Sequence, residues 1–158
     1  MEDISVVSLK MVRDRILSFD NISSPRIVYD ICDEILKDCD RENIIAICLD
    51  SQNKPTNISI VGVGSIRTAI AEPREIFKTA ILSNSNSIIV AHNHPSGEVK
   101  PSHADIYFTK RLIRCGTLLG IKILDHIIVG DEEYFSFKEN CVCNFDVNDK
   151  VKSFIEED

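Results

Sequence analysis

The feature that most constrains the fold is the apolar run from Ser87 to Ala91, which leads directly into His92-Asn93-His94-Pro95. Near-continuous apolar runs of this length are typical of a central strand with both faces covered. Such a strand needs both faces of its sheet to be covered by other parts of the chain. The run therefore predicts a central strand in a covered sheet, with two histidines where the strand ends.

The patterns on either side of this run predict the remaining elements. Asp50 to Pro55 is a turn between two β-branched segments, which indicates a hairpin. Helices are indicated where Pro or Ser precedes residues with apolar spacing near 3.6. The expected strands span 4–12, 43–49, 57–63, 121–129 and 134–137, and the expected helices span 25–37, 73–82 and 102–116, the last stopping at Cys115-Gly116.

A chain of 158 residues is long enough for one domain with a substantial core. It contains no repeat, low-complexity tract or linker that would divide it. Hairpins combined with three helices favour the α+β class, a mixed sheet flanked by helices in a single domain.

The net charge and the absence of targeting signals limit the possible partners and location of the protein. The net charge of −7 is the reverse of the basic footprint of phosphate-backbone binding, which argues against nucleic acid as a partner of the isolated chain. The amino terminus lacks a basic segment followed by an apolar one, and no apolar run is long enough to cross a membrane. We expect a cytoplasmic protein with no membrane partner. The sequence does not indicate an oligomeric state.

The six cysteines are scattered, which favours reduced thiols in such a compartment. Cys141 and Cys143 form a C-x-C pair without a second pair or a histidine at ligand spacing. They are expected to be ordinary cysteines, and a structural zinc there is the less favoured alternative.

A candidate metal site follows the central strand. His92 and His94 are two residues apart, so in a strand both imidazoles point to the same side. Asp105 falls in the first turn of the helix that starts at Ser102, after a loop with two prolines and a glycine that could fold its carboxylate back over the histidines. Two histidines and a carboxylate form a catalytic zinc set that leaves one position for water. For the histidine pair alone, polar loop residues would be an equal alternative.

The spacing His92-x-His94-x7-Ser102-x2-Asp105 resembles the complete JAMM motif, and His-Asn-His-Pro-Ser-Gly resembles its form in the RadC-like branch. Segments 73–78 and 124–130 also resemble RadC-family segments, so the likeness covers residues 40–137. It implies a JAB1/MPN (cytidine-deaminase-like) fold. It also implies Zn²⁺ held by His92, His94 and Asp105, with the Ser102 hydroxyl assisting the oxyanion.

The same resemblance divides the chain into three parts. Residues 1–39 would be an N-terminal strand and helix packed on the domain, 40–140 the RadC-like JAMM zinc domain, and 141–158 an acidic C-terminal tail. RadC proteins commonly carry a helix-hairpin-helix region before this domain. Residues 1–39 show no glycine-containing hairpin between two helices, so we expect a short form without that region.

Amide hydrolysis also needs a carboxylate that takes and returns a proton. The family position for it matches Glu42, just before the first hairpin strand, and Glu75 is the alternative, although an acid near a helix start explains Glu75 adequately. His103 is expected to be a solvated helix residue. His126 is expected to be a structural histidine, with a contact to a metal ligand as the less favoured alternative.

The resemblance implies a zinc-dependent metallopeptidase or isopeptidase with a peptide or isopeptide substrate. The alternative is a DNA repair or recombination accessory protein of the RadC family without peptidase activity, and the acidic charge argues against it. A metal-bearing scaffold that binds a peptide at a sheet edge without cutting it ranks third. The sequence does not identify the substrate.

Overall fold

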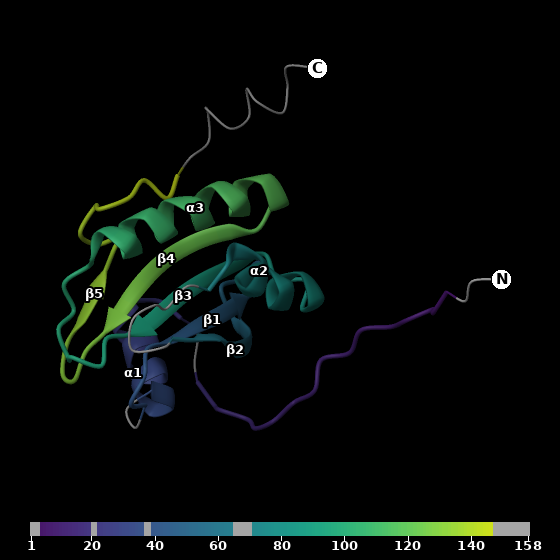
Figure 1. Cartoon of the computed structure of the whole chain (residues 1–158), viewed down its shortest axis with the longest axis horizontal. Helices are drawn as coiled ribbons and strands as arrows, with labels where there is room; N and C mark the ends of the chain where they lie inside the picture. Colours follow the sequence, from purple (N-terminus) through teal and green to yellow (C-terminus); the bar gives the residue numbers. More distant parts are fainter. Residues whose placement is uncertain (1–3, 20–21, 37–38, 65–70, 147–158) are drawn as a thin grey trace, which may run out of the picture.

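The computed structural model describes residues 4–19, 22–36, 39–64 and 71–146. Within them a five-stranded mixed sheet has the order β2-β1-β3-β4-β5. Helices flank this sheet, as Figure 1 shows. This confirms the predicted α+β single-domain architecture. The elements are α1 (Pro25–Leu36), β1 (Asn43–Leu49), β2 (Pro55–Val63), α2 (Pro73–Leu82), β3 (Ser87–Asn93), α3 (His103–Leu119), β4 (Lys122–Val129) and β5 (Tyr134–Ser136).

The central strand is β3, as the apolar run predicts. It pairs antiparallel with β1 and parallel with β4, and all seven of its residues are buried. The strand continues beyond Ala91 through His92 and Asn93, so His92 lies inside the ladder, opposite Ile44 of β1 and Ile128 of β4.

Each face of the sheet has its own apolar core, because strand residues alternate between the faces. On one face, Ile44, Ala46, Ile88 and Val90 pack with residues of α2 and α3. On the other face, residues including Ile45, Ile47, Ile89 and Ala91 pack with residues of α1. The predicted coverage of both faces is confirmed.

The predicted strand at residues 4–12 is wrong. Residues 4–16 are all exposed, and in Figure 1 this segment runs away from the sheet. Alternation of apolar residues shows that a segment could form a strand, but a strand also needs a neighbour with free backbone groups. The outer strands β2 and β5 each pair on one side only, and neither is joined by this segment.

The predicted helix end at Cys115-Gly116 is also wrong, because α3 continues to Leu119. Gly116 does not end the helix. Its lack of a side chain lets the backbone of Ile121 approach α3 closely, since a Cβ at this position would clash with the carbonyl oxygen of Ile121. The chain leaves the helix at Gly120, whose φ of 68° is left-handed and favours glycine.

Part of the segment 141–158, which is predicted to be an acidic C-terminal tail, contacts the rest of the domain. Phe145 is buried in the core that includes α2 and α3, and Asp146 forms an ion pair with Lys122 at 2.9 Å. Residues 147–158, the rest of the predicted tail, lie outside the described residues. In the part of the chain that is described, no helix is both long and apolar enough to cross a bilayer.

Candidate metal centre

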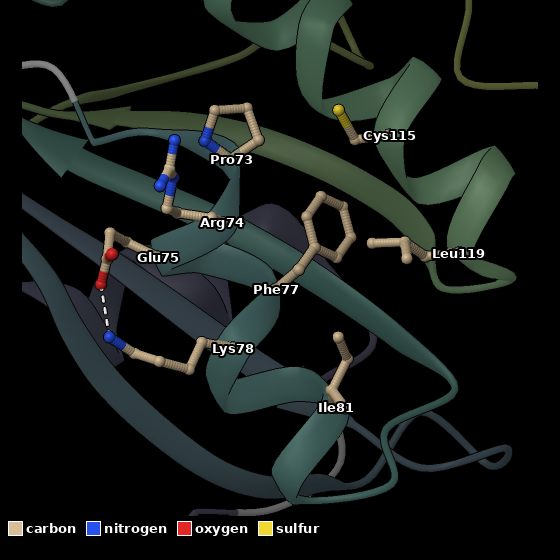
Figure 2. Close-up of a pocket in the computed structure, with 8 residues that line it drawn as sticks. All are labelled: Pro73, Arg74, Glu75, Phe77, Lys78, Ile81, Cys115 and Leu119. Atoms are coloured by element: carbon tan, nitrogen blue, oxygen red, sulfur yellow. Dashed lines mark hydrogen bonds and ion pairs between the residues drawn. The ribbon is translucent and has the colours of Figure 1, made fainter. Parts of the chain in front are cut away.

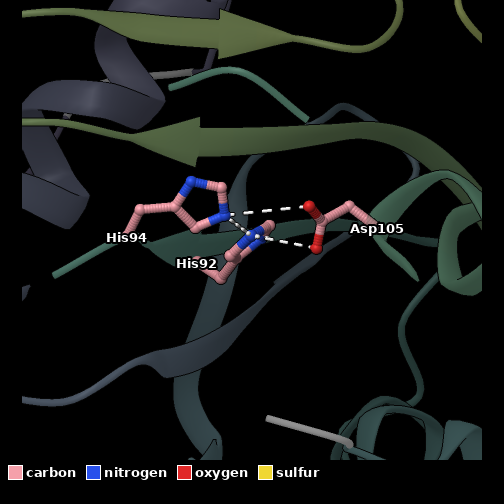
Figure 3. Close-up of side chains that lie close together, drawn as sticks. All are labelled: His92, His94 and Asp105. Carbon is pink, nitrogen blue, oxygen red and sulfur yellow. Dashed lines mark hydrogen bonds and ion pairs between the residues drawn. The ribbon is translucent and has the colours of Figure 1, made fainter. Parts of the chain in front are cut away.

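The two histidines of the motif come from the end of β3. His92 is buried within the ladder, and His94 follows the strand, where its backbone N–H still donates to Val129 O at 3.3 Å. Their Nε2 atoms lie 3.0 Å apart. Figure 3 shows both rings turned toward one point.

Asp105 reaches the same point from the first turn of α3, and a capping box sets its orientation. Ser102 Oγ accepts a hydrogen bond from Asp105 N, and Asp105 Oδ2 accepts hydrogen bonds from Ser102 N at 2.7 Å and Ser102 Oγ at 2.6 Å. The carboxylate then lies with Oδ1 3.4 Å from His92 Nε2 and Oδ2 3.7 Å from His94 Nε2. The local signal that starts the helix thus also aims the acid at the histidines.

The three side chains fit a metal ion. One ligand atom from each lies within 4.8 Å of the others. Tetrahedral zinc with bonds near 2.0–2.2 Å separates its ligand atoms by roughly 3.3–3.5 Å, close to the distances found here. Burial lowers the pKa of His92 to about 4, so at neutral pH its ring is uncharged and can act as a ligand.

Glu42 lies beside this group, immediately before β1. Its Oε1 is 3.9 Å from His92 Nε2, and its side chain is partly buried. Burial raises the pKa of this carboxyl above its ordinary value. The chain folds this way because β1 runs antiparallel to β3, which brings the beginning of β1 next to the end of β3.

Asn93 connects the segment around Glu42 to β3 by hydrogen bonds, a role that was not predicted from the sequence. Its Oδ1 accepts a hydrogen bond from Asn43 N at 2.7 Å, and its Nδ2 donates to Arg41 O at 3.0 Å. These bonds hold the backbone on both sides of Glu42. The only available signal was its place between the two histidines, where alternation turns its side chain to the opposite face.

Glu75, the alternative acid, lies in different surroundings. Its carboxylate pairs with Lys78 at 2.5 Å in the first turns of α2. Glu75 lines an apolar groove of about 470 Å³ between α2 and α3, together with Pro73, Arg74, Phe77, Lys78, Ile81, Cys115 and Leu119. Figure 2 shows these side chains. Of the two acids, Glu42 is the one in contact range of His92.

His126 and Thr109 lie buried behind His92. His92 Nδ1 is 2.8 Å from His126 Nε2, and His126 Nδ1 is 2.6 Å from Thr109 Oγ1. The less favoured expectation for His126, contact with a candidate ligand, is therefore the one that the structure shows. Thr109 was not predicted, although it stands one helical turn after Asp105.

His103 is exposed, as predicted.

A second cavity, of about 270 Å³, adjoins His94. It is lined by Asp33, Leu36, Cys39, Asn93, His94, Pro95, Val129, Gly130 and Asp131. The cavity supplies space beside the candidate ligands.

All six cysteines of the chain are free.

The fold and this group define an α+β protein with a candidate His-His-Asp metal centre at the end of its central strand. Residues 22–142 match the model of the family described as RadC-like JAB domain, and the chain belongs to that family.

Three relatives, each called a UPF0758 protein, show the same likeness. The protein from Methanosarcina mazei is 44% identical over 118 residues, which cover 75% of this chain and 52% of that protein. The protein from Pelobacter propionicus is 41% identical over 128 residues, covering 81% and 56%. The protein from Staphylococcus haemolyticus is 46% identical over 118 residues, covering 75% and 52%. The chain thus matches only about half the length of these relatives.

Proposed function

We propose that the chain is a zinc-dependent hydrolase that cleaves an amide bond in a peptide or isopeptide. The observation that carries this proposal is the approach of Glu42 to His92, at the point where His94 and Asp105 also converge. A candidate metal set beside a partly buried acid has the composition that metal-assisted hydrolysis requires.

His92, His94 and Asp105 would hold the metal. Zinc would supply a Lewis acid that lowers the pKa of a water molecule and polarises a carbonyl. The two rings enter as neutral ligands and the carboxylate offsets part of the charge, and the set leaves a position open for water. The six free cysteines suit a reducing compartment, in keeping with a cytoplasmic enzyme.

Glu42 would act as the general base and then as the acid. Its pKa is raised because the side chain is partly buried, and a raised pKa suits a carboxyl that must take a proton from water and return it to the leaving amine. The hydrogen bonds of Asn93 to the flanking backbone would keep the carboxyl in place during this exchange.

Ser102 would assist the oxyanion. Its hydroxyl is exposed and donates to Asp105 Oδ2 in the structure. We propose that it turns from the carboxylate to the carbonyl oxygen of the substrate when Asp105 binds a metal. A well-placed donor of this kind contributes about 3–4 kcal/mol to the transition state.

The test is a cleavage screen of peptide and isopeptide libraries with zinc-loaded protein, in which wild type is compared with Glu42→Gln. The amide preserves the volume of the side chain but cannot take the proton, so cleavage is expected to disappear while zinc content and fold remain. Glu75→Gln is the matched control and is expected to keep wild-type activity. Full cleavage by Glu42→Gln, or its loss in Glu75→Gln alone, would contradict the proposal.

A further inference from the structure

A buried chain of hydrogen bonds joins two of the candidate metal ligands through the interior. It runs from the backbone oxygen of Asp105 to Thr109 Oγ1 at 2.6 Å, then to His126 Nδ1 at 2.6 Å. From His126 Nε2 it continues to His92 Nδ1 at 2.8 Å. His126 and Thr109 are completely buried, so water does not compete for these bonds.

The direction of each bond follows from the number of protons available. A threonine hydroxyl has one proton, and the carbonyl oxygen of Asp105 can only accept, so Thr109 donates its proton there. Toward His126, Thr109 Oγ1 must therefore accept. His126 Nδ1 carries the proton of that bond.

The remaining nitrogen of His126 decides the state of His92. His126 is completely buried, and its two ring nitrogens contact a hydroxyl oxygen and another imidazole, neither of which would offset the charge of an imidazolium. The ring is therefore neutral and its Nε2 has no proton. Nε2 then accepts a hydrogen bond, and His92 Nδ1 is the donor. His92 thus carries its proton on Nδ1 and presents an unprotonated Nε2 to Asp105 and His94.

Packing holds the ring of His126 in the orientation that this chain needs. Phe137 stacks on the ring with centroids 4.7 Å apart and an interplanar angle of 16°. Phe108 approaches it edge-on at 6.1 Å. The ring plane is therefore set by apolar neighbours, and its two nitrogens stay aligned with Thr109 and His92.

His94 reaches the same state by a separate route. Its Nδ1 is 2.7 Å from the carbonyl oxygen of Glu98, which can only accept, so the proton lies on Nδ1. Two unprotonated Nε2 atoms then face each other across 3.0 Å. Two lone pairs at this distance repel each other, and a shared cation turns the repulsion into coordination.

We propose that Thr109 and His126 are positioning residues that set the tautomer of His92, so that its Nε2 is presented ready for a metal ion. The inference rests on the proposed metal site and names the part of the chain that prepares it. In this arrangement, buried residues set the tautomer of His92, whereas the carbonyl oxygen of Glu98 in the adjoining loop sets that of His94.

The first test measures the tautomer directly in metal-free protein. Long-range nitrogen-15 correlation spectra of the histidine rings are expected to show His92 and His94 both protonated on Nδ1. This measurement needs no variant and no activity, so it stands even if the chain cleaves no peptide. Protonation of His92 on Nε2 in the wild type would overturn the inference.

The second test compares Thr109→Val, which removes the hydroxyl at nearly constant volume, with Thr109→Ser, which keeps it. Without the acceptor, the proton of His126 is expected to move to Nε2, and His92 then changes its tautomer. Zinc affinity, measured by competition with a chromophoric chelator, is expected to fall about 10–100-fold in Thr109→Val. Thr109→Ser is expected to bind zinc as the wild type does.

His94 serves as an internal control, because its Nδ1 bond to Glu98 does not involve Thr109. Circular dichroism identifies a variant that has lost its fold, and Thr109→Ala then replaces Thr109→Val. A folded variant without the hydroxyl that retains both the wild-type His92 tautomer and the wild-type zinc affinity would overturn the inference. A merely structural threonine would change stability but leave the tautomer unaltered.

Discussion

At the scale of single residues, the candidate centre depends on side chains that serve both the fold and the site. Asp105 caps α3 through Ser102 and faces the two histidines with the same carboxylate. The motif spacing brought these residues into the prediction because the capping signal and the histidine pair are both local. Asn93 and His126 act through residues distant in sequence, so one-dimensional spacing carried little information about them.

The first prediction concerns the metal. Purified protein reconstituted with zinc is expected to hold one ion per chain by elemental analysis, because the described residues include one His-His-Asp group of ligand geometry. Free zinc at 100 times its dissociation constant would raise the free energy of unfolding by about 2.7 kcal/mol. Chelation is expected to reverse this stabilisation.

A His92→Ala and His94→Ala double variant is expected to lose the zinc, whereas His103→Ala, at an exposed helix position, is expected to keep it. Unchanged zinc in the double variant would show that the ion binds elsewhere.

The second prediction concerns Asn93. Replacing it by Ala leaves the buried N–H of Asn43 without its side-chain acceptor, which is expected to cost about 1–3 kcal/mol of unfolding free energy. Because the backbone around Glu42 is released, kcat is expected to fall while zinc affinity stays near that of the wild type. Urea unfolding and steady-state kinetics would measure the two effects.

Asn86→Ala, at an exposed position, is the matched control and is expected to change neither quantity. Loss of zinc in Asn93→Ala would indicate that Asn93 supports the histidines and not the acid.

At the scale of elements, patterns were reliable where one segment contains all the information. The predicted limits of β1 and α2 agree with the structure because a turn or a proline marks their ends. The strand predicted at residues 4–12 failed because pairing depends on a partner elsewhere in the chain. The end of α3 was misplaced because Gly116 was taken as a helix end. A glycine is needed there for close contact with Ile121, and the spacing of apolar residues along the helix gives no information about that contact.

The third prediction distinguishes the two glycines of α3. Gly116→Ala would place a methyl group against the backbone of Ile121 and near Phe77, and it is expected to lower the unfolding free energy by about 1–3 kcal/mol. Gly120→Asn is the control, because nothing lies within 4 Å of a Cβ there and asparagine tolerates the left-handed conformation. Chemical denaturation measures both. A neutral Gly116→Ala would show that the end of α3 moves away from β4 at little cost.

At the scale of the whole molecule, the fold could be predicted because one fully apolar strand requires two covered faces, and two cores are found. The direction of pairing could not be predicted. β3 has an antiparallel neighbour on one side and a parallel neighbour on the other. These directions depend on how the chain connects the strands, which the residue pattern of β3 does not encode.

The fourth prediction concerns nucleic acid. With a net charge of −7, the chain is expected to bind single- and double-stranded oligonucleotides no more tightly than about 10⁻⁴–10⁻⁶ M near physiological salt. Fluorescence anisotropy over a salt series would measure this binding, with a basic DNA-binding domain as positive control. Sub-micromolar, sequence-selective binding would favour the recombination role over hydrolysis.

The antiparallel pairing of β1 with β3 has a consequence for how the protein acquires its centre during folding. Ile44 lies opposite His92 across 48 positions of the sequence, and a shift of one residue would turn every side chain of β1 to the other face of the sheet. The acid and the histidines therefore meet in only one register. Because pairing between residues so far apart in the sequence is slow to form, we expect the chain to have its complete site only once the sheet is correctly aligned.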